Sequence, residues 1–257
     1  MKYGFIGCGN MGSAIAKAIE KKTDSIMVSD TSGKAKALGY AYGSAEATAG
    51  QCQRLFLAVK PQTMGTVLAG LQDILREKKP LLITMAAGLR MDQIAQMAGG
   101  DLPMIRIMPN TPVAIGKGVT LYCCNELVAQ ETLEDFLADM SCSGEMVALD
   151  EALFDAGTSL SGCGPAFVYM FLQAMAEGAA AWGIEEATAL ELAAATVSGA
   201  AQMIKATGKH PTALRDAVCS PGGSTIAGVR VLEEKALHDT VAAAIAASYR
   251  RNQELGK

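Results

Sequence analysis

The chain has 257 residues, a length that allows one large domain or two moderate ones. Half of its residues are hydrophobic and 19% are charged, which is enough apolar material for a sizeable core. The net charge of −4 and the lack of a basic cluster argue against nucleic acid and anionic membrane as partners.

The cysteines and histidines indicate an intracellular protein without a metal site. The seven cysteines are odd in number and show no CxxC spacing, and there are two histidines, so we expect reduced thiols and no bound metal. The first strand is expected to begin at Lys2, which leaves no room for a signal peptide. Gln173 and Glu177 interrupt the apolar run at 165–181, which argues against a membrane span. We therefore expect a cytoplasmic location.

A glycine-rich loop opens the chain. A strand-like run at 2–6 is followed by GCGNMG and then by an alanine- and isoleucine-rich helix to about Lys21. GxGxxG between a strand and a helix is typical of dinucleotide-binding domains. Gly7 would make the turn, Gly9 would let the backbone approach a pyrophosphate, and Gly12 would let helix and strand pack closely. The predicted contacts of a nicotinamide dinucleotide here are Gly7, Gly9, Asn10, Met11 and Gly12.

The loop after the second expected strand, at 26–29, concerns the choice of cofactor. Asp30 directly follows this strand. An acid in that position binds the ribose hydroxyls of the adenosine and favours NAD over NADP. Ser32, Lys34 and Lys36 follow, and these could cradle a 2′-phosphate if Asp30 turned away. NADPH and NADH therefore both stay open. The predicted contacts in this loop are Ser29, Asp30 and Thr31.

Two continuous apolar runs, at 55–59 and 81–85, predict parallel strands buried on both faces, and a third run, at 102–108, predicts a further strand. Their carboxyl ends should line the crevice in which a dinucleotide lies. After the third run, two prolines bracket Asn110 and Thr111 in a stiff turn, whose polar side chains could face the nicotinamide carboxamide. The predicted cofactor contacts from these ends are Ala58, Val59, Lys60, Pro61, Ala86, Gly88 and Asn110.

Two more strand-like runs, at 118–123 and 145–149, flank a helical pattern from about Glu126 to Met140. Together with the earlier strands and intervening helices, they predict an α/β fold. We expect an N-terminal Rossmann-type, doubly wound sheet over residues 1–150 that binds the dinucleotide.

The composition changes after Asp150: alanine becomes dominant and strand signals almost disappear. The expected helices are 151–160, 164–183, 185–207, 211–219, 224–235 and 239–255. The long pair within 164–207 has no polar face, and so few residues cannot bury it in a lone bundle. We therefore expect residues 151–257 to form an all-α dimerisation and substrate-binding domain in a homodimer. A tight monomeric bundle is the alternative.

Within this helical part lies the sequence SPGGST, at residues 220–225. Pro221 and the two glycines predict a turn that ends one helix and starts another. Ser224 and Thr225 then fall on a first helical turn, whose N–H groups and dipole bind a phosphate or a carboxylate. An ordinary loop with a helix cap is the alternative. The predicted substrate contacts are Ser220, Gly222, Gly223, Ser224 and Thr225.

Over its whole length the chain resembles the Δ1-pyrroline-5-carboxylate reductase family. The segments similar to that family's motifs are GFIGCGNMG (4–12), AVKP (58–61), RIMPNTP (106–112), LSGCGPAF (160–167) and SPGGSTIAGVRVLEE (220–234). The last is the most specific, with His210-Pro211 and LRDxV before it. The chain departs from the family at Cys163, which usually is serine, at Ala45, which often is polar, and at Asp30, where members that prefer NADPH often have hydroxyls or a basic residue.

The resemblance implies reduction of a cyclic imine by NADPH or NADH to give L-proline. It implies that the substrate carboxylate lies on the N–H groups around Gly223, Ser224 and Thr225, and that catalysis is mostly positioning for hydride transfer. Thr225 is the expected catalytic residue, by hydrogen bonding at the imine nitrogen; His210 is expected to be structural. A homodimer is implied, and a larger homo-oligomer is open.

Other functions stay open from the sequence. One is a close relative that acts on the six-membered homologue of the imine or on another cyclic imino acid. A β-hydroxyacid-dehydrogenase-like oxidoreductase would need a lysine on the helix entered at Gly164, and residues 165–168 supply none. A dinucleotide sensor without activity would have no need of SPGGST.

Overall fold

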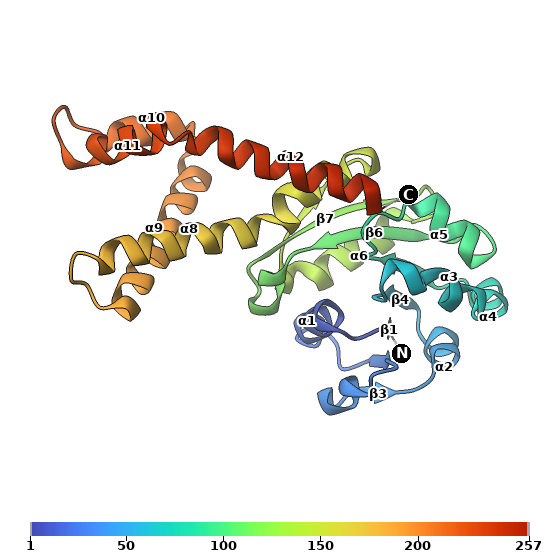
Figure 1. Cartoon of the computed structure of the whole chain (residues 1–257). Coiled ribbons are helices and arrows are strands. Elements are labelled where there is room, and N and C mark those ends of the chain that lie inside the picture. The colour runs from blue at the N-terminus through green and yellow to red at the C-terminus, as the bar shows by residue number, and fades with distance from the viewer. Residues whose placement is uncertain (1, 256–257) are drawn as a thin grey trace. The chain divides into compact units, whose positions relative to one another are not determined.

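The computed structural model describes residues 2–255 (Figure 1). Its packing divides the chain into two compact units. The first runs through Cys163 and resumes at Ser248, and the second is Gly164–Ala247. This division falls later than residue 150, because residues 151–163 pack with the sheet rather than with the helices that follow.

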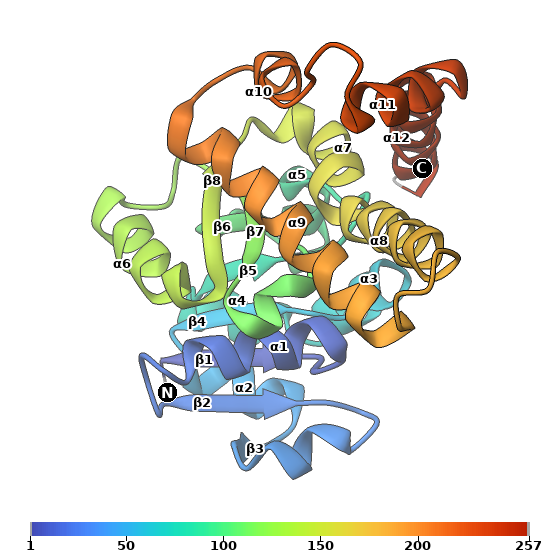
Figure 2. The ribbon, with the colours of Figure 1, turned by 90° about the vertical axis from the view of Figure 1, so that its left-hand side faces the viewer.

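A single sheet within residues 2–255 organises the first unit, with eight strands in the order β3-β2-β1-β4-β5-β6-β7-β8. Figure 2 shows the amino-terminal strands, in blue, at one end of it. Neighbouring strands are parallel except β6 and β7, which are antiparallel. The strands are β1 (Tyr3–Ile6), β2 (Ile26–Ser29), β3 (Ala41–Tyr42), β4 (Arg54–Leu57), β5 (Leu81–Thr84), β6 (Met104–Pro109), β7 (Gly118–Cys124) and β8 (Gly144–Ala148).

Helices cover both faces of this sheet, which confirms the predicted doubly wound fold. One face packs α1 and α6 against β1, β2 and β6 around a fully buried Phe56. The other face packs α2 to α5 around Leu55, Leu57 and Leu82. The helices are α1 (Asn10–Ile19), α2 (Ala45–Gln51), α3 (Pro61–Ala69), α4 (Gln72–Lys78), α5 (Met91–Ala98) and α6 (Gln130–Met140). The 3₁₀ helices among them are η1 (Lys34–Leu38), η2 (Thr111–Ile115) and η3 (Ser141–Ser143).

The prediction of a single helix at 151–160 is wrong in detail. The chain forms a 3₁₀ helix η4 (Glu151–Leu153), a short α7 (Phe154–Gly157) and a π-helical turn η5 (Thr158–Gly162). Two hydroxyls bond back to carbonyls of the preceding turn, Ser159 to Asp155 at 2.7 Å and Ser161 to Gly157 at 3.0 Å. Such bonds compete with regular helical bonding, which explains the irregular path.

The second unit is helical, as predicted, and has little core of its own. It contains α8 (Gly164–Ala180), α9 (Glu186–Thr207), α10 (Pro211–Ala217), α11 (Ser224–Glu234) and most of α12 (Leu237–Leu255). Among its described residues only Ala176, Ala189 and Ala193 are buried, whereas Met170 and Trp182 are 70% and 91% exposed. No helix within residues 2–255 combines the length and the apolar character needed to cross a membrane.

The last turns of α12 return to the first unit. There the side-chain amide of Asn252 donates hydrogen bonds to the carbonyl of Asp155 at 3.1 Å and to the hydroxyl of Ser159 at 3.2 Å. The end of α12 is thereby fixed to the segment through which the chain leaves the first unit.

A buried ionic cluster joins the sheet to α6. The Arg54 guanidinium donates to the Tyr3 hydroxyl at 2.7 Å and to Asp139 Oδ2 at 3.0 Å, and Lys2 Nζ lies 2.7 Å from the same oxygen. Burial, and then the hydrogen bond to Asp139, raise the pKa of Tyr3. Burial also acts to raise the pKa of Asp139, but hydrogen bonds from Lys2 and Tyr3 outweigh it and lower that pKa.

This cluster makes Asp139 a stability determinant. We expect Asp139→Ala to lower the free energy of unfolding at neutral pH by about 3 kcal/mol, because Arg54 would keep a buried charge without its main partner. Because the pKa of Asp139 is lowered in the folded state, its stabilisation is present above the unfolded pKa of about 3.9 and is lost as the pH falls through the folded pKa. Urea unfolding across acidic and neutral pH measures both effects.

Asp135 provides the matched control, since its carboxylate also meets Arg54, at 3.1 Å, but is 66% exposed. We expect Asp135→Ala to cost less than about 1 kcal/mol. Equal losses for the two variants would contradict the assignment of Asp139 as the main partner of Arg54.

Candidate functional site

The predicted cofactor residues gather at one edge of the sheet. Ile6 is in register with Ser29 on one side and with Leu57 on the other, and Leu57 is in register with Thr84. The loops that follow β1, β2, β4 and β5 therefore leave the sheet side by side. The strand order reverses between β1 and β4, and in doubly wound sheets this is where a dinucleotide binds.

The glycines of the first loop divide into two kinds. Gly7 has φ +85°, and a Cβ there would lie 2.6 Å from the Ala58 carbonyl oxygen. A Cβ at Gly12 would lie 2.9 Å from the Gly7 carbonyl oxygen, so α1 packs tightly on this turn. At Gly9, in contrast, a Cβ would meet nothing within 4 Å. Gly7 and Gly12 are required by protein packing, whereas Gly9 faces open space that a ligand can enter.

The amino end of α1 is suited to an anion. Gly9 is its N-cap residue and no side chain caps it. The first N–H groups of α1 therefore face the open space at Gly9, where the helix dipole favours negative charge. Asn10 is exposed beside them, while Met11 packs partly against the core. The residues of this loop fit a dinucleotide pyrophosphate.

Asp30, at the end of β2, is held by its neighbours. Its carboxylate accepts the Cys8 N–H at 3.4 Å and the Ser32 N–H at 3.1 Å, and also the Ser32 hydroxyl. Burial, and then the Asp30 carboxylate, raise the pKa of the Cys8 thiol to about 11, so Cys8 is protonated at neutral pH. The carboxylate thus lies between the glycine loop and the loop after β2.

One of the two lysines in the loop after β2 contacts an aromatic ring of the protein. Lys36 Nζ lies 5.0 Å above the ring centre of Tyr42, a cation–π contact. The Tyr42 hydroxyl donates to the Asp30 carbonyl oxygen. Thr31 is exposed, and the side chain of Lys34 lies outside what the structure describes.

The loops after β4 and β5 present mainly backbone. Lys60 is exposed as the N-cap residue of α3, with Pro61 at the first helical position, where its missing N–H costs nothing. Ala58 and Val59 before them are half-buried. Ala86 is buried and Gly88 has φ +77°, which suits glycine in the turn.

Asn110 is used by the protein itself. Its side chain accepts the Val119 N–H at 2.9 Å and donates to the Ser161 carbonyl at 2.9 Å, and the residue is 8% exposed. The amide therefore joins β6, β7 and the π-helical turn. This structural role was not expected from the sequence, and its predicted contact with the nicotinamide stays a prediction.

The SPGGST loop lies in the second unit. Gly222 has φ +73°, and the Gly223 N–H donates to the Ser220 carbonyl at 3.0 Å, which closes the turn. Gly223 is the N-cap residue of α11 and no side chain caps this helix end. Ser224 and Thr225, both exposed, occupy its first turn. The predicted uncapped helix start is therefore present at α11, and its binding of an anion stays a prediction.

His210 caps the start of a helix, which agrees with the structural role expected for it. It is the N-cap residue of α10, and its Nδ1 accepts the Thr212 N–H at 3.2 Å. A ring nitrogen that accepts this bond carries no proton there, so this atom is not a proton donor in the described geometry.

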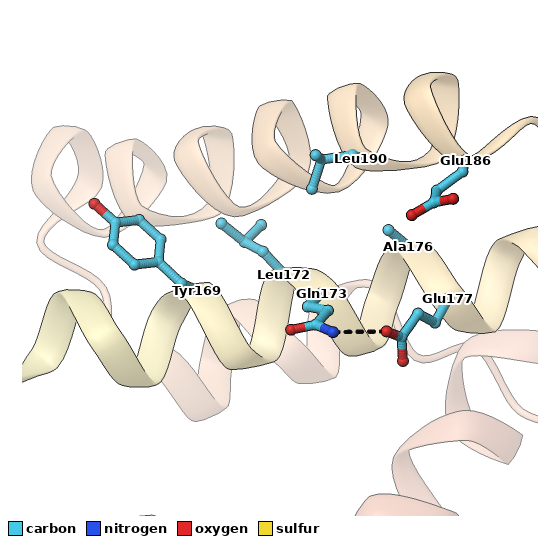
Figure 3. A pocket seen from close by; sticks show the side chains of 7 residues that line it. All are labelled: Tyr169, Leu172, Gln173, Ala176, Glu177, Glu186 and Leu190. Carbon is cyan, nitrogen blue, oxygen red and sulfur yellow. Dashed lines mark hydrogen bonds between the residues drawn. The ribbon is translucent and has the colours of Figure 1, made fainter.

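Two hollows mark the helical unit. Figure 3 shows the first, a groove of about 290 Å³ in which Tyr169, Leu172 and Ala176 of α8 face Leu190 and Glu186 of α9. The second, of about 950 Å³, is lined by α10, α11 and α12 with Val229, Leu232 and Val241 among its apolar residues. Both combine apolar residues with charged ones, Glu177 and Glu186 in the first and Arg215 and Glu233 in the second.

Two family models match the chain. The model described as pyrroline-5-carboxylate reductase dimerisation matches residues 151–255, and the one described as NADP oxidoreductase, coenzyme F420-dependent, matches residues 2–88. Together they account for most of the chain.

Full-length relatives give the same result. The chain is 39% identical to pyrroline-5-carboxylate reductase of Escherichia coli (strain K12), covering 100% of this chain and 98% of the relative. Identity to the Synechocystis enzyme of that name is 40%, covering 100% and 99%. The crystal structure of Plasmodium falciparum pyrroline carboxylate reductase with NADP bound matches with a TM-score of 0.92 at 30% identity, covering 100% and 98%.

The two kinds of glycine lead to opposite expectations. We expect Gly9→Ala to leave the unfolding midpoint within about 2 °C of the wild type, while raising the Kd for a nicotinamide dinucleotide about tenfold or more, because its Cβ would enter the ligand's space. Gly7→Ala should lower the midpoint clearly, because of its positive φ and the contact with Ala58. Thermal unfolding and dinucleotide fluorescence titration check both. Normal dinucleotide binding by Gly9→Ala would contradict this site.

Proposed function

Since the chain belongs to the pyrroline-5-carboxylate reductase family, we propose that it reduces Δ1-pyrroline-5-carboxylate to L-proline with NADPH or NADH. The observation that supports the proposal is that two helices without a side-chain cap, α1 and α11, begin at the two glycine-containing motifs. The α1 end lies in a dinucleotide crevice, and the α11 end carries SPGGST. These two ends could bind the pyrophosphate of a dinucleotide and the carboxylate of a substrate.

We propose that the cofactor is held mostly by backbone at the carboxyl edge of the sheet. The pyrophosphate would meet Gly9 and the first N–H groups of α1, and the adenosine ribose would meet Asp30. Ala58 to Pro61, Ala86, Gly88 and Asn110 would line the rest of the crevice. When bound, the reduced dinucleotide supplies the hydride for the imine carbon.

The substrate carboxylate would lie on the N–H groups at Gly223, Ser224 and Thr225. The dipole of α11 favours negative charge there without a buried cationic side chain. Binding at one fixed end orients the C=N bond, and correct orientation supplies much of the rate enhancement in such a reaction. The imine carbon would receive the hydride, and the proton already on the nitrogen of the protonated imine would remain there in the amine.

Thr225 is proposed to hydrogen-bond at that nitrogen. Its hydroxyl donates or accepts, but a hydroxyl without an adjacent base is a poor general acid. Its role would be to orient the protonated imine, which is already a good electrophile. Ser220 is a second hydroxyl of the same loop.

We propose that residues 151–257 mediate a homodimer, with 1–150 as the dinucleotide-binding domain, in the cytoplasm. The match of residues 151–255 to a dimerisation model supports the homodimer, as do the exposed apolar side chains of α8 and α9 and the two grooves. A second copy would cover these surfaces.

The direct test is oxidation of NADH and of NADPH by the purified protein, followed by absorbance, with and without pyrroline-5-carboxylate. Oxidation that depends on the imine supports the proposal. Dinucleotide binding without oxidation would overturn it, and the six-membered homologue of the imine should then be tested, as a substrate of the related cyclic imino acid reductases.

Thr225→Ala should lower kcat/KM for the imine by about one order of magnitude or more with an unchanged Kd for the dinucleotide, because a contact with the reacting nitrogen would be lost. Thr225→Ser keeps the hydroxyl and should keep most of the activity. Steady-state kinetics and fluorescence titration separate the two quantities. Full activity in the alanine variant would leave Thr225 as a helix residue only.

Asp30 is proposed to set the ratio of the two cofactors, because a carboxylate accepts ribose hydroxyls and repels a 2′-phosphate. Asp30→Ser should raise kcat/KM for NADPH relative to NADH by about tenfold. Measuring the ratio rather than either rate controls for a general loss of activity. An unchanged ratio would show that Asp30 serves only to join the loops through Cys8 and Ser32.

A further inference from the structure

One carboxylate connects three segments that are far apart in the sequence. Glu151 Oε1 accepts a hydrogen bond from Arg106 Nη1 at 3.0 Å and one from the Met91 N–H at 2.8 Å. Arg106 lies in β6, Met91 is the first residue of α5, and Glu151 begins η4. Glu151 is also the first residue of the segment that matches the dimerisation model.

Arg106 depends on this carboxylate. The Arg106 side chain is 3% exposed, and its guanidinium lies 4.6 Å from the ring centre of Phe154. A charge removed from water in this way needs an ionic partner, and breaking such a pair is strongly unfavourable. Because Glu151 and Phe154 belong to the same short segment, Arg106 holds η4 and α7 against β6.

The same carboxylate accepts a hydrogen bond from the first N–H group of α5. The first N–H groups of a helix have no partner within the helix, and a carboxylate is favourable there. Glu151 supplies that acceptor to Met91, so α5 begins at a fixed point.

Two contacts hold the loop between β5 and α5. Within the loop, Ala87 packs against the apolar cluster that contains Met108, Leu121 and Phe154. At its carboxyl end Met91 is bonded to Glu151. Between these two points lies Gly88, with its positive φ.

We propose that Glu151 is a positioning residue for the dinucleotide, acting through the β5–α5 loop. This inference rests on the proposed function only in taking Ala86 and Gly88 as part of the cofactor crevice. Glu151 fixes the loop backbone in the conformation that receives the dinucleotide, and it does so from the first residues of the dimerisation segment.

The test measures dinucleotide binding without imine, by NADPH and NADH fluorescence titration of the whole protein. We expect Glu151→Ala to raise the Kd about tenfold, because the loop would lose its fixed end. Glu151→Gln keeps an oxygen acceptor for the Met91 N–H and should raise the Kd only about threefold. Asp150→Asn changes the exposed acid next in the chain and should leave the Kd unchanged.

A second measurement separates positioning from general stability. The rise in unfolding midpoint on adding a fixed concentration of dinucleotide should shrink in Glu151→Ala, since this rise depends on Kd. A purely structural role would lower the midpoint with and without dinucleotide by the same amount. If Glu151→Ala does not fold, the glutamine variant decides in the same way.

The outcomes distinguish the two proposals. A Kd within about twofold of the wild type in a folded Glu151 variant overturns the positioning role, even if the enzyme reduces the imine. A raised Kd in a protein that never reduces the imine supports the positioning role while the proposed function fails. A wild-type protein that binds no dinucleotide overturns both.

Discussion

The close approach of the β1–α1 turn to β4 is the contact on which the rest of the first unit depends. Gly7 and Gly12 leave no room for a side chain between this turn and Ala58. With these two glycines, α1 starts directly at the place where the strand order reverses. Its amino end then faces the carboxyl edge of the sheet. Every loop that lines the crevice is arranged around that helix end.

The helical unit has the opposite character. The sheet buries large side chains on both faces, whereas the described helices of residues 164–247 bury only three alanines. A chain segment with so little core gains little free energy from folding alone. If a second copy covers these helices, as proposed, folding of this unit and association are one equilibrium, and its stability depends on protein concentration. The SPGGST loop belongs to this unit, so its geometry would depend on the same equilibrium.

Much of the architecture could be predicted from the sequence, because local patterns carry it. The apolar runs predicted β1, β2 and β4 to β8 to within two residues. The alanine-rich composition and the breakers between helices predicted α8 to α12. The two-residue strand β3 and the π-helical turn were missed, since neither has a periodic signal. The turn forms because Ser159 and Ser161 bond back to the chain, a choice that composition does not reveal.

Within the candidate site, the sequence predicted the turns and helix starts but not the hydrogen-bond partners that lie far apart in the sequence. Gly7, Gly12 and the start of α11 follow from motif and helix rules. The bonds of Asn110 to Val119 and Ser161, and those of Glu151 to Arg106 and Met91, depend on how the sheet brings distant segments together. A charged residue inside an otherwise apolar strand, such as Arg106, was the one signal that a buried partner must exist.

The path of the chain has a consequence for its synthesis. Because α12 ends in the first unit, the helical unit is an insertion within it, and the bonds of Asn252 to Asp155 and Ser159 form only when residues near 252 have left the ribosome. The sheet can assemble earlier, since its strands all precede residue 150. Until then the π-helical turn lacks its partner from α12. The order of translation thus places completion of the first unit after the whole helical unit has emerged.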